Sequence, residues 1–123
     1  MKRATSQIPV PASRISRKRE RTRDELIFAA ETLFAERGVE AVSIDEITQA
    51  ADVAKGTFYN HFTDKSELAR AIARAVRSEI ENEVDSANAT VSDPAQRVAR
   101  AVSVFLRFAA EQPVRARALL RLF

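Results

Sequence analysis

The 123-residue sequence contains no cysteine, no tryptophan and only one histidine, His61. The lack of cysteine excludes disulfides and thiolate nucleophiles, and together with the single histidine it excludes a zinc site built from His and Cys. Four carboxylates stand where first helical turns are expected, and capping explains them there: Asp45, Glu46, Asp64 and Glu67. We therefore expect no enzymatic activity, no catalytic residues, no metal site and no cofactor.

Long hydrophobic runs are also missing from the sequence. No apolar stretch approaches the roughly 18 residues that a membrane helix needs. Residues 1–12 lack the apolar segment of about 7 to 15 residues found in secretion signals. We expect a soluble cytoplasmic protein with one hydrophobic core and no membrane partner.

Acidic residues are scarce at the N-terminus. Residues 1–23 hold eight Lys or Arg against one Glu, a balance of +7, whereas the whole chain carries +3. This asymmetry is typical of a disordered basic arm that binds a polyanion, because neutralised phosphates release their condensed counterions. A solvated tail that only keeps the protein soluble is the alternative.

Glycine and proline are few, at two and four residues, and the apolar residues recur at helical spacing, which predicts an all-α fold. Capping residues set the expected bounds. Helices are expected from Thr22 to Gly38, for about eight residues after Ser43, from Ala54 or Lys55, from Asp64 to about residue 88, from Asp93 to Glu111, and from Pro113 onward. The fifth helix is expected to bury Val98, Val102, Phe105, and Phe108 or Ala109.

Two short helices joined by a three- or four-residue turn at residues 44–62 predict a helix-turn-helix, which places its second helix in the DNA major groove. At 100° per residue, Phe58 and Phe62 point inward while Gly56, Thr57 and Asn60 point outward. Lys55 and Tyr59 flank this outward face on one side and His61 on the other. An ordinary amphipathic helix with solvated polar residues is the alternative.

Residues 22–73 resemble the DNA-binding domain of tetracycline-repressor-like (TetR/AcrR) regulators. The resemblance rests on Ala29-Ala30, Leu33-Phe34, Gly38, Ser43 to Ile47, Ala50-Ala51, Val53, the run Lys55 to Phe62, and Lys65. It implies a three-helix, homeodomain-like helix-turn-helix domain at 22–64, preceded by the basic disordered arm at 1–21. A connecting helix and a partial helical regulatory and dimerisation domain would follow at 65–123.

The resemblance also implies roles for individual residues. Base edges or the groove would be contacted by Lys55, Gly56, Thr57 and Asn60, and phosphates by Ser43, Tyr59, His61 and Lys65. The basic arm, with Arg17, Lys18, Arg19, Arg21 and Arg23, would reach a neighbouring groove. Ala54 departs from the family, which often has a Ser or Thr cap at this position, so about 1 kcal/mol of capping is expected to be lost.

The resemblance implies a transcriptional regulator, a repressor that binds a near-palindromic operator as a homodimer and is released by a small-molecule effector. Five apolar residues late in the chain either line part of an effector pocket or form core and uncovered surface: Phe105, Phe108, Leu119, Leu120 and Phe123. The alternative function is a truncated helical interaction module that does not regulate alone.

Overall fold

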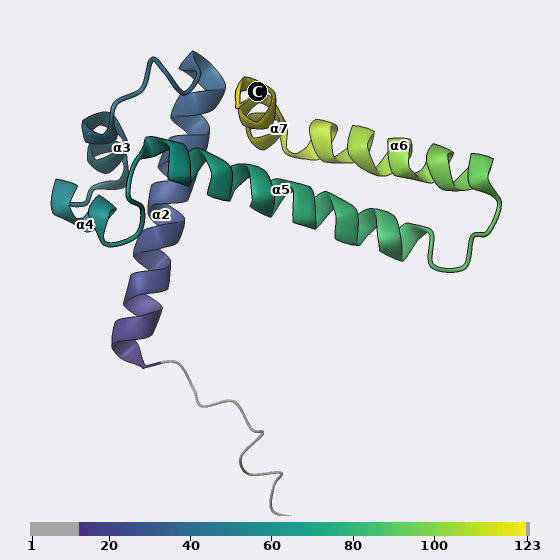
Figure 1. Ribbon diagram of the computed structural model, residues 1–123, viewed down its shortest axis with the longest axis horizontal. Helices are drawn as coiled ribbons and strands as arrows, with labels where there is room; N and C mark the ends of the chain where they lie inside the picture. Colours follow the sequence, from purple (N-terminus) through teal and green to yellow (C-terminus); the bar gives the residue numbers. More distant parts are fainter. Residues whose placement is uncertain (1–12, 123) are drawn as a thin grey trace, which may run out of the picture.

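The computed structural model describes residues 13–122, and all regular structure in this part of the chain is helical. The helices are α2 (Arg14–Arg37), α3 (Ile44–Ala51), α4 (Lys55–Tyr59), α5 (Lys65–Ala87), α6 (Pro94–Glu111) and α7 (Pro113–Arg121). Helices α2 to α4 form a compact head, from which α5 and α6 extend as a long hairpin (Figure 1). The all-α fold with a helix-turn-helix head and a long connecting helix is confirmed.

The head is held together by a hydrophobic core between α2, α3 and α4. Phe34 of α2, Ile47 of α3 and Phe58 of α4 are completely buried. Burial of a side chain of this size contributes roughly 1.5–3 kcal/mol relative to leaving it in water. Leu68 and Ile72 of α5 belong to the same cluster, so the connecting helix is packed into the head rather than attached by a loose linker.

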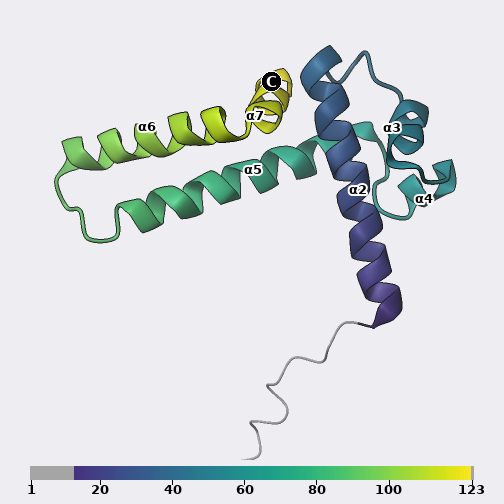
Figure 2. The same ribbon diagram turned by 180° about the vertical axis from the view of Figure 1, so that it is seen from behind.

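The hairpin runs away from the head and returns to it. Helix α6 lies antiparallel beside α5, and α7 then packs against the C-terminal half of α2 (Figure 2). The bend between α5 and α6 is fixed by Asn88, whose Nδ2 donates to the carbonyl of Arg97 at 3.1 Å. In return, the Arg97 guanidinium donates to the carbonyls of Asn88 and Val91, at 3.1 and 2.6 Å. No helix within residues 13–122 is both long and apolar enough to cross a membrane.

An ion cluster ties α7 to α2 and α5. Arg115 Nε lies 3.3 Å from Glu31 Oε2, and Arg115 Nη1 lies 2.9 Å from Glu79 Oε2. The Glu31 side chain is only 9% exposed, and this burial raises its pKa above the ordinary value, although Arg115 opposes the shift. The Arg115 guanidinium also lies over the Phe108 ring, 5.6 Å from the centroid.

Most helix starts match the expected caps. Ser43, Asp64 and Asp93 each accept a hydrogen bond from the backbone N–H three residues later, which satisfies a donor that the helix leaves unpaired. Gly38 ends α2 with a φ of 80°, a conformation that favours glycine, but its ψ of 163° is extended rather than left-handed helical.

The expected start of the first helix was wrong. Helix α2 begins at Arg14, capped by Ser13, and Thr22 lies inside it, where its hydroxyl donates to the carbonyl of Lys18. Residues 14–21 are therefore helical and do not form a disordered arm, because arginine, lysine and glutamate favour helix and no Gly or Pro interrupts them. Residues 1–12 of the expected arm lie outside the described residues.

The buried face of α6 was also misassigned. Val98, Val102 and Phe105 are 64%, 52% and 47% exposed. Phe108 is buried as expected, and Val104, which was not expected to be, is buried with it. Helix α6 carries apolar residues on two faces, and α5 and α7 cover only the face with Val104 and Phe108. Of the other late apolar residues, Leu119 is partly buried, Leu120 is 73% exposed, and Phe123 lies outside the described residues.

Candidate nucleic-acid interface

The helix-turn-helix consists of α3, a turn and α4. A reciprocal capping box starts α3, in which Ser43 Oγ accepts from the Glu46 N–H at 3.1 Å and Glu46 Oε1 accepts from the Ser43 N–H at 2.9 Å. Asp52 makes the turn in a left-handed conformation, with φ 58° and ψ 48°, which Asp tolerates better than most residues. Ala54 precedes α4 and provides no side-chain cap, as expected, because alanine has no side-chain oxygen that could accept a hydrogen bond.

Arg37 reinforces this arrangement from the end of α2. Its guanidinium donates to both carboxylate oxygens of Glu46 and to the carbonyl of Ala41. The hydrogen bond from Arg37 and those from Ser43 lower the pKa of Glu46 to about 2. Helices α2 and α3 are thus joined through Glu46 of the capping box, a contact that the sequence alone did not indicate.

Two phenylalanines set the orientation of α4. Phe58 is fully buried and Phe62 is 2% exposed, and their ring centroids lie 5.7 Å apart. The opposite side of α4 presents Gly56, where an added Cβ would meet no atom within 4 Å. Lys55 and Asn60 are exposed as expected, while Thr57 is half-buried. The outward face is therefore small and polar, and it is open to an approaching molecule.

Three of the four residues expected to hold phosphates lie together. Ser43, Tyr59 and Lys65 line a hollow of about 300 Å³ between the starts of α3 and α5 and the side of α4. Lys65 Nζ donates to the carbonyl of Val42 at 2.7 Å, which fixes the ammonium at the edge of this hollow. Tyr59 packs edge-on against Phe58, with ring centroids 5.3 Å apart, and remains 49% exposed.

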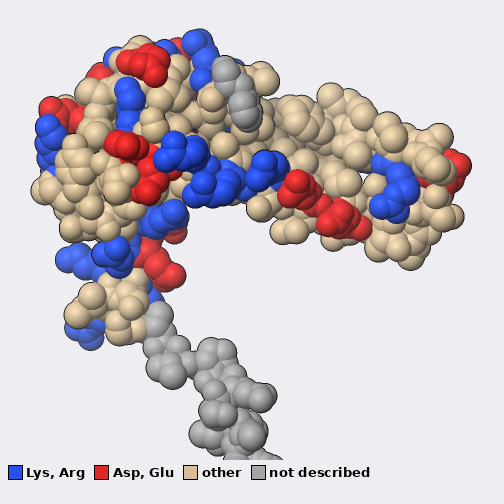
Figure 3. Space-filling view, in the orientation of Figure 1, with Lys and Arg blue, Asp and Glu red and all other residues tan. Residues whose placement is uncertain are grey.

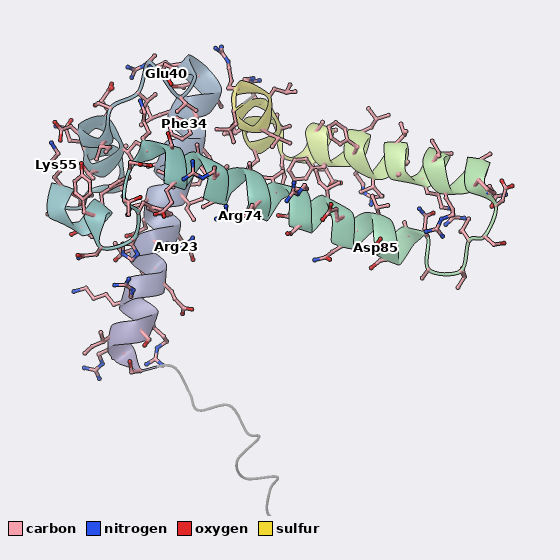
Figure 4. All side chains as sticks on the ribbon, in the orientation of Figure 1. Arg23, Phe34, Glu40, Lys55, Arg74 and Asp85 are labelled. Carbon is pink, nitrogen blue, oxygen red and sulfur yellow. The ribbon has the colours of Figure 1, made fainter. Side chains whose placement is uncertain are left out.

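Lys55 reaches the same hollow and forms an ion pair there. Its Nζ lies 3.2 Å from Asp45 Oδ1, and both side chains are more than half exposed. Figure 4 labels Lys55 at the start of α4. Exposed pairs of this kind contribute only about 0–1 kcal/mol. A phosphate or a base could therefore replace Asp45 as the partner of Lys55 at little cost.

His61 lies apart from this hollow, beside the N-terminal half of α2. Burial and the neighbouring charges of Arg19 and Arg23 lower its pKa below the ordinary value. Arg19 Nη2 donates to the carbonyl of Asn60 at 2.8 Å, and the Arg23 guanidinium lies 5.1 Å from the centroid of the Phe62 ring. His61 is thus uncharged over more of the pH range than expected for a phosphate contact.

The basic segment is helical from Arg14 and lies beside the end of α4 rather than forming a separate arm. Arg17, Lys18, Arg19, Arg21 and Arg23 all lie on α2, and Figure 3 shows cationic side chains on both sides of its N-terminal half, with acidic ones between them. Arg19 and Arg23 hold this half of the helix beside the end of α4. Sequence reasoning missed these two contacts, because they join residues about 40 positions apart and leave no local signal.

The chain was compared with known proteins. The family model described as "Bacterial regulatory proteins, tetR family" matches residues 26–72. The HTH-type transcriptional activator FasR of Mycolicibacterium smegmatis is 36% identical over 90 residues, which are 73% of this chain and 41% of that protein. The HTH-type transcriptional repressor KstR2 of Rhodococcus jostii is 42% identical over 66 residues, which are 54% of this chain and 32% of that protein.

A solved structure agrees with these sequence relatives. The TetR family protein CprB from S. coelicolor superposes with a TM-score of 0.76 at 33% identity, covering 84% of this chain and 53% of that one. The chain thus spans less than half the length of FasR and KstR2 and about half of CprB. The matched residues include the whole of α3 and α4, and the chain belongs to the tetR family of bacterial regulatory proteins.

Proposed function

We propose that this chain binds double-stranded DNA sequence-specifically and regulates transcription, with α4 placed in the major groove. The observation that carries the proposal is the fixed orientation of α4. Buried Phe58 and Phe62 turn Gly56 and Asn60 outward, beside a hollow that contains Ser43, Tyr59 and Lys65. A small outward face flanked by cations and hydroxyl groups suits close approach to a duplex.

The residues divide into two groups by what they would contact. Lys55, Gly56, Thr57 and Asn60 lie on or beside the outward face of α4 and would meet base edges or the groove. Ser43, Tyr59 and Lys65 would hold phosphates on one side of the helix, and His61 on the other. Tyr59 and Lys65 supply an exposed phenol and an ammonium, whereas His61 would donate one neutral N–H.

The basic helical segment would bind the DNA backbone beyond the half-site that α4 occupies. Lys18 and Arg21 are exposed on α2, and the guanidinium of Arg19 has five N–H donors, of which one bonds to the carbonyl of Asn60. A charged segment held in a helix needs no further ordering on binding. The segment would therefore increase affinity for all sequences without selecting among them.

The regulator would act as a homodimer on a near-palindromic operator in the cytoplasm, repressing transcription until a small-molecule effector binds. The supporting observation is membership of a family whose named relatives include the repressor KstR2. FasR, named an activator, shows that the sign of regulation differs within the family. The alternative of a helical interaction module is not favoured, because the family match falls on the DNA-binding head.

Fluorescence anisotropy with a randomised duplex library, followed by titration of the selected duplex and a scrambled one, tests the proposal. We expect salt-sensitive binding that prefers the selected duplex. Equal affinity for the scrambled duplex would refute sequence-specific recognition. Sedimentation with and without the duplex tests the homodimer, since a strict monomer on the DNA would contradict it.

Variants separate the two groups of residues. Lys65→Ala should weaken binding to every duplex, because one phosphate contact is lost. The slope of the logarithm of the binding constant against the logarithm of the salt concentration should become smaller by about 1. Asn60→Ala should change the preference among sequences, with a loss of about 1–3 kcal/mol at one position. Arg117→Ala, an exposed arginine on α7, is the matched control and should leave both properties unchanged.

A further inference from the structure

A groove of about 360 Å³ lies along α5, where α6 and α7 pack against it. Its floor is apolar and includes Ala73, Ile80, Phe105 and Leu119, contributed by all three helices. Small-molecule sites usually measure roughly 300–1,000 Å³ and are mainly apolar with a few polar groups. The groove therefore has the size and lining of a site for a small ligand.

Three arginines, Arg70, Arg74 and Arg77, form one rim of the groove. Their spacing of four and three residues places them on one face of α5, and all three are exposed. None of them makes an ion pair or a side-chain hydrogen bond within residues 13–122. Glu81 is the one carboxylate among the described lining residues, a turn beyond Arg77.

Basic and acidic residues are separated along α5. Cationic residues lie in the first part of the helix, from Lys65 to Arg77, and carboxylates occupy the last part, from Glu79 to Asp85, with Glu67 as the exception in the first turn. The change from basic to acidic is visible along α5 in Figure 3, and Figure 4 labels Arg74 and Asp85 on either side of it. The helix dipole acts only within the first and last turns, so it does not account for three arginines in the interior of α5. Their exposed guanidinium groups are open to a partner outside the helix.

We propose that this groove binds a small anionic amphiphile, with its acidic head group on Arg74 and Arg77 and its apolar body on Ile80, Phe105 and Leu119. The planar guanidinium presents parallel N–H donors that match the oxygens of a carboxylate or phosphate. The inference rests on the proposed function and names the chemical class of its effector. DNA fits this surface less well, because the floor is apolar and the hairpin extends away from α3 and α4 (Figure 1).

Isothermal titration calorimetry of the full chain with decanoate, below the micelle concentration, tests the proposal. We expect decanoate to bind at one site and decanol, its uncharged analogue, to bind at least about tenfold more weakly. One charge-assisted hydrogen bond contributes about 1.5 kcal/mol or more, and 1.4 kcal/mol corresponds to a factor of ten. Decyl phosphate in a parallel titration shows which acidic head group the arginines prefer.

Variants locate the site. Arg74→Ala and Arg77→Ala should each weaken decanoate binding about tenfold and leave decanol binding unchanged, whereas Arg117→Ala on α7 should change neither. Circular dichroism checks that each variant is folded, and Arg74→Gln replaces Arg74→Ala if that variant is not. Equal affinity for decanoate and decanol, or binding unaffected by both arginine changes, would overturn the proposal.

Titration of DNA into the same preparations separates this inference from the proposed function. Operator binding without any decanoate binding refutes the effector class alone, and arginine-dependent decanoate binding without DNA binding refutes the regulator alone. If Arg74→Ala and Arg77→Ala weaken DNA binding and not decanoate binding, the rim belongs to the DNA interface. If sedimentation shows a dimer that Leu119→Arg disrupts while decanoate does not bind, the groove is a subunit interface, which also overturns the proposal.

Discussion

Replacement of Arg115 by methionine tests whether the buried ion cluster holds the head to the hairpin. Among residues 13–122, Arg115 is the one cation that pairs with Glu31 and Glu79, at 3.3 and 2.9 Å. Its side chain is 25% exposed, that of Glu31 is 9% exposed, and that of Glu79 is 39% exposed. Methionine keeps an aliphatic chain against Phe108 but removes the charge, so Arg115→Met leaves the Glu31 carboxylate buried without a cation.

The magnitude follows from these exposures. Breaking a buried ion pair by removing one partner costs about 3–5 kcal/mol, whereas a surface pair contributes about 0–1 kcal/mol. By its exposure, Glu79 resembles the partner of a surface pair and Glu31 the partner of a buried pair, and the exposure of Arg115 lies between theirs. We therefore expect Arg115→Met to lower the free energy of unfolding by about 2–4 kcal/mol, which corresponds to roughly 10 °C or more in Tm for a domain of this size.

Urea and thermal unfolding, followed by circular dichroism, measure this loss. Burial already raises the pKa of Glu31 above its ordinary value, and in Arg115→Met no cation opposes this shift, so the pKa of Glu31 rises further in the folded state. The stability of the variant should therefore rise more than that of the unmutated protein as the pH falls through this raised pKa, and it should be lost again as the pH rises through it. Arg117→Met on the same helix is the control and should change stability by less than about 0.5 kcal/mol.

The double variant Glu31→Gln with Arg115→Met distinguishes a buried charge from lost packing. A neutral amide needs no cation, so the double variant should recover at least half of the stability lost in Arg115→Met. If it recovers none, and if the single variant shows no pH-dependent gain, the cost arises from lost contacts with Phe108. The reasoning from the uncompensated carboxylate would then be refuted.

Three further changes test other parts of the structure. Arg37 and Ser43 lower the pKa of Glu46 to about 2, so this carboxylate contributes stability that is lost as the pH falls from the ordinary pKa of about 4.3 toward 2. Glu46→Gln should therefore flatten this part of the acid-unfolding curve, measured by circular dichroism. Gly56→Ala should raise the free energy of unfolding by about 0.5–1 kcal/mol and weaken DNA binding in anisotropy titrations, and an unchanged affinity would contradict close approach of DNA to α4. Asn88→Ala should cost about 1–3 kcal/mol in urea unfolding, because the Arg97 carbonyl loses the hydrogen bond from the Asn88 side chain, whereas Asn82→Ala on the exposed face of α5 should change little.

Local capping chemistry made most helix bounds predictable. Ser43, Asp64 and Asp93 each bond to a backbone N–H three residues away, so the signal and the structure lie within one helical turn. Thr22 carries the same signal but lies inside α2, since its hydroxyl can bond to the carbonyl four residues earlier just as well. A cap motif marks a start only where the preceding residues do not themselves favour helix.

Burial was harder to predict than secondary structure on α6. The 3.6-residue period identified Val98, Val102, Phe105, and Phe108 or Ala109 as the buried face, but a face with Val104 and Phe108 fits the same period. Which of the two is covered depends on where α5 and α7 lie, and this is a property of the whole fold. For Phe58 on α4 and Phe62 just beyond its end the period was sufficient, because no other large apolar residues in this segment offered an inward face.

The ordered basic segment changes how the candidate site would generate affinity. A disordered arm loses conformational entropy when it binds, at about 1–2 kcal/mol for each residue whose backbone becomes fixed. In this protein Arg19 and Arg23 already attach the segment to α4 and Phe62, so that entropy is lost on folding and not on binding. The same contacts place the charges of α2 at a fixed distance from the outward face of α4. Phosphate contacts from α2 and groove contacts from α4 would therefore form at fixed positions relative to each other on the DNA. Charge that serves only solubility does not require such an attachment, which favours a role for this segment in DNA binding over a role as a solvated tail.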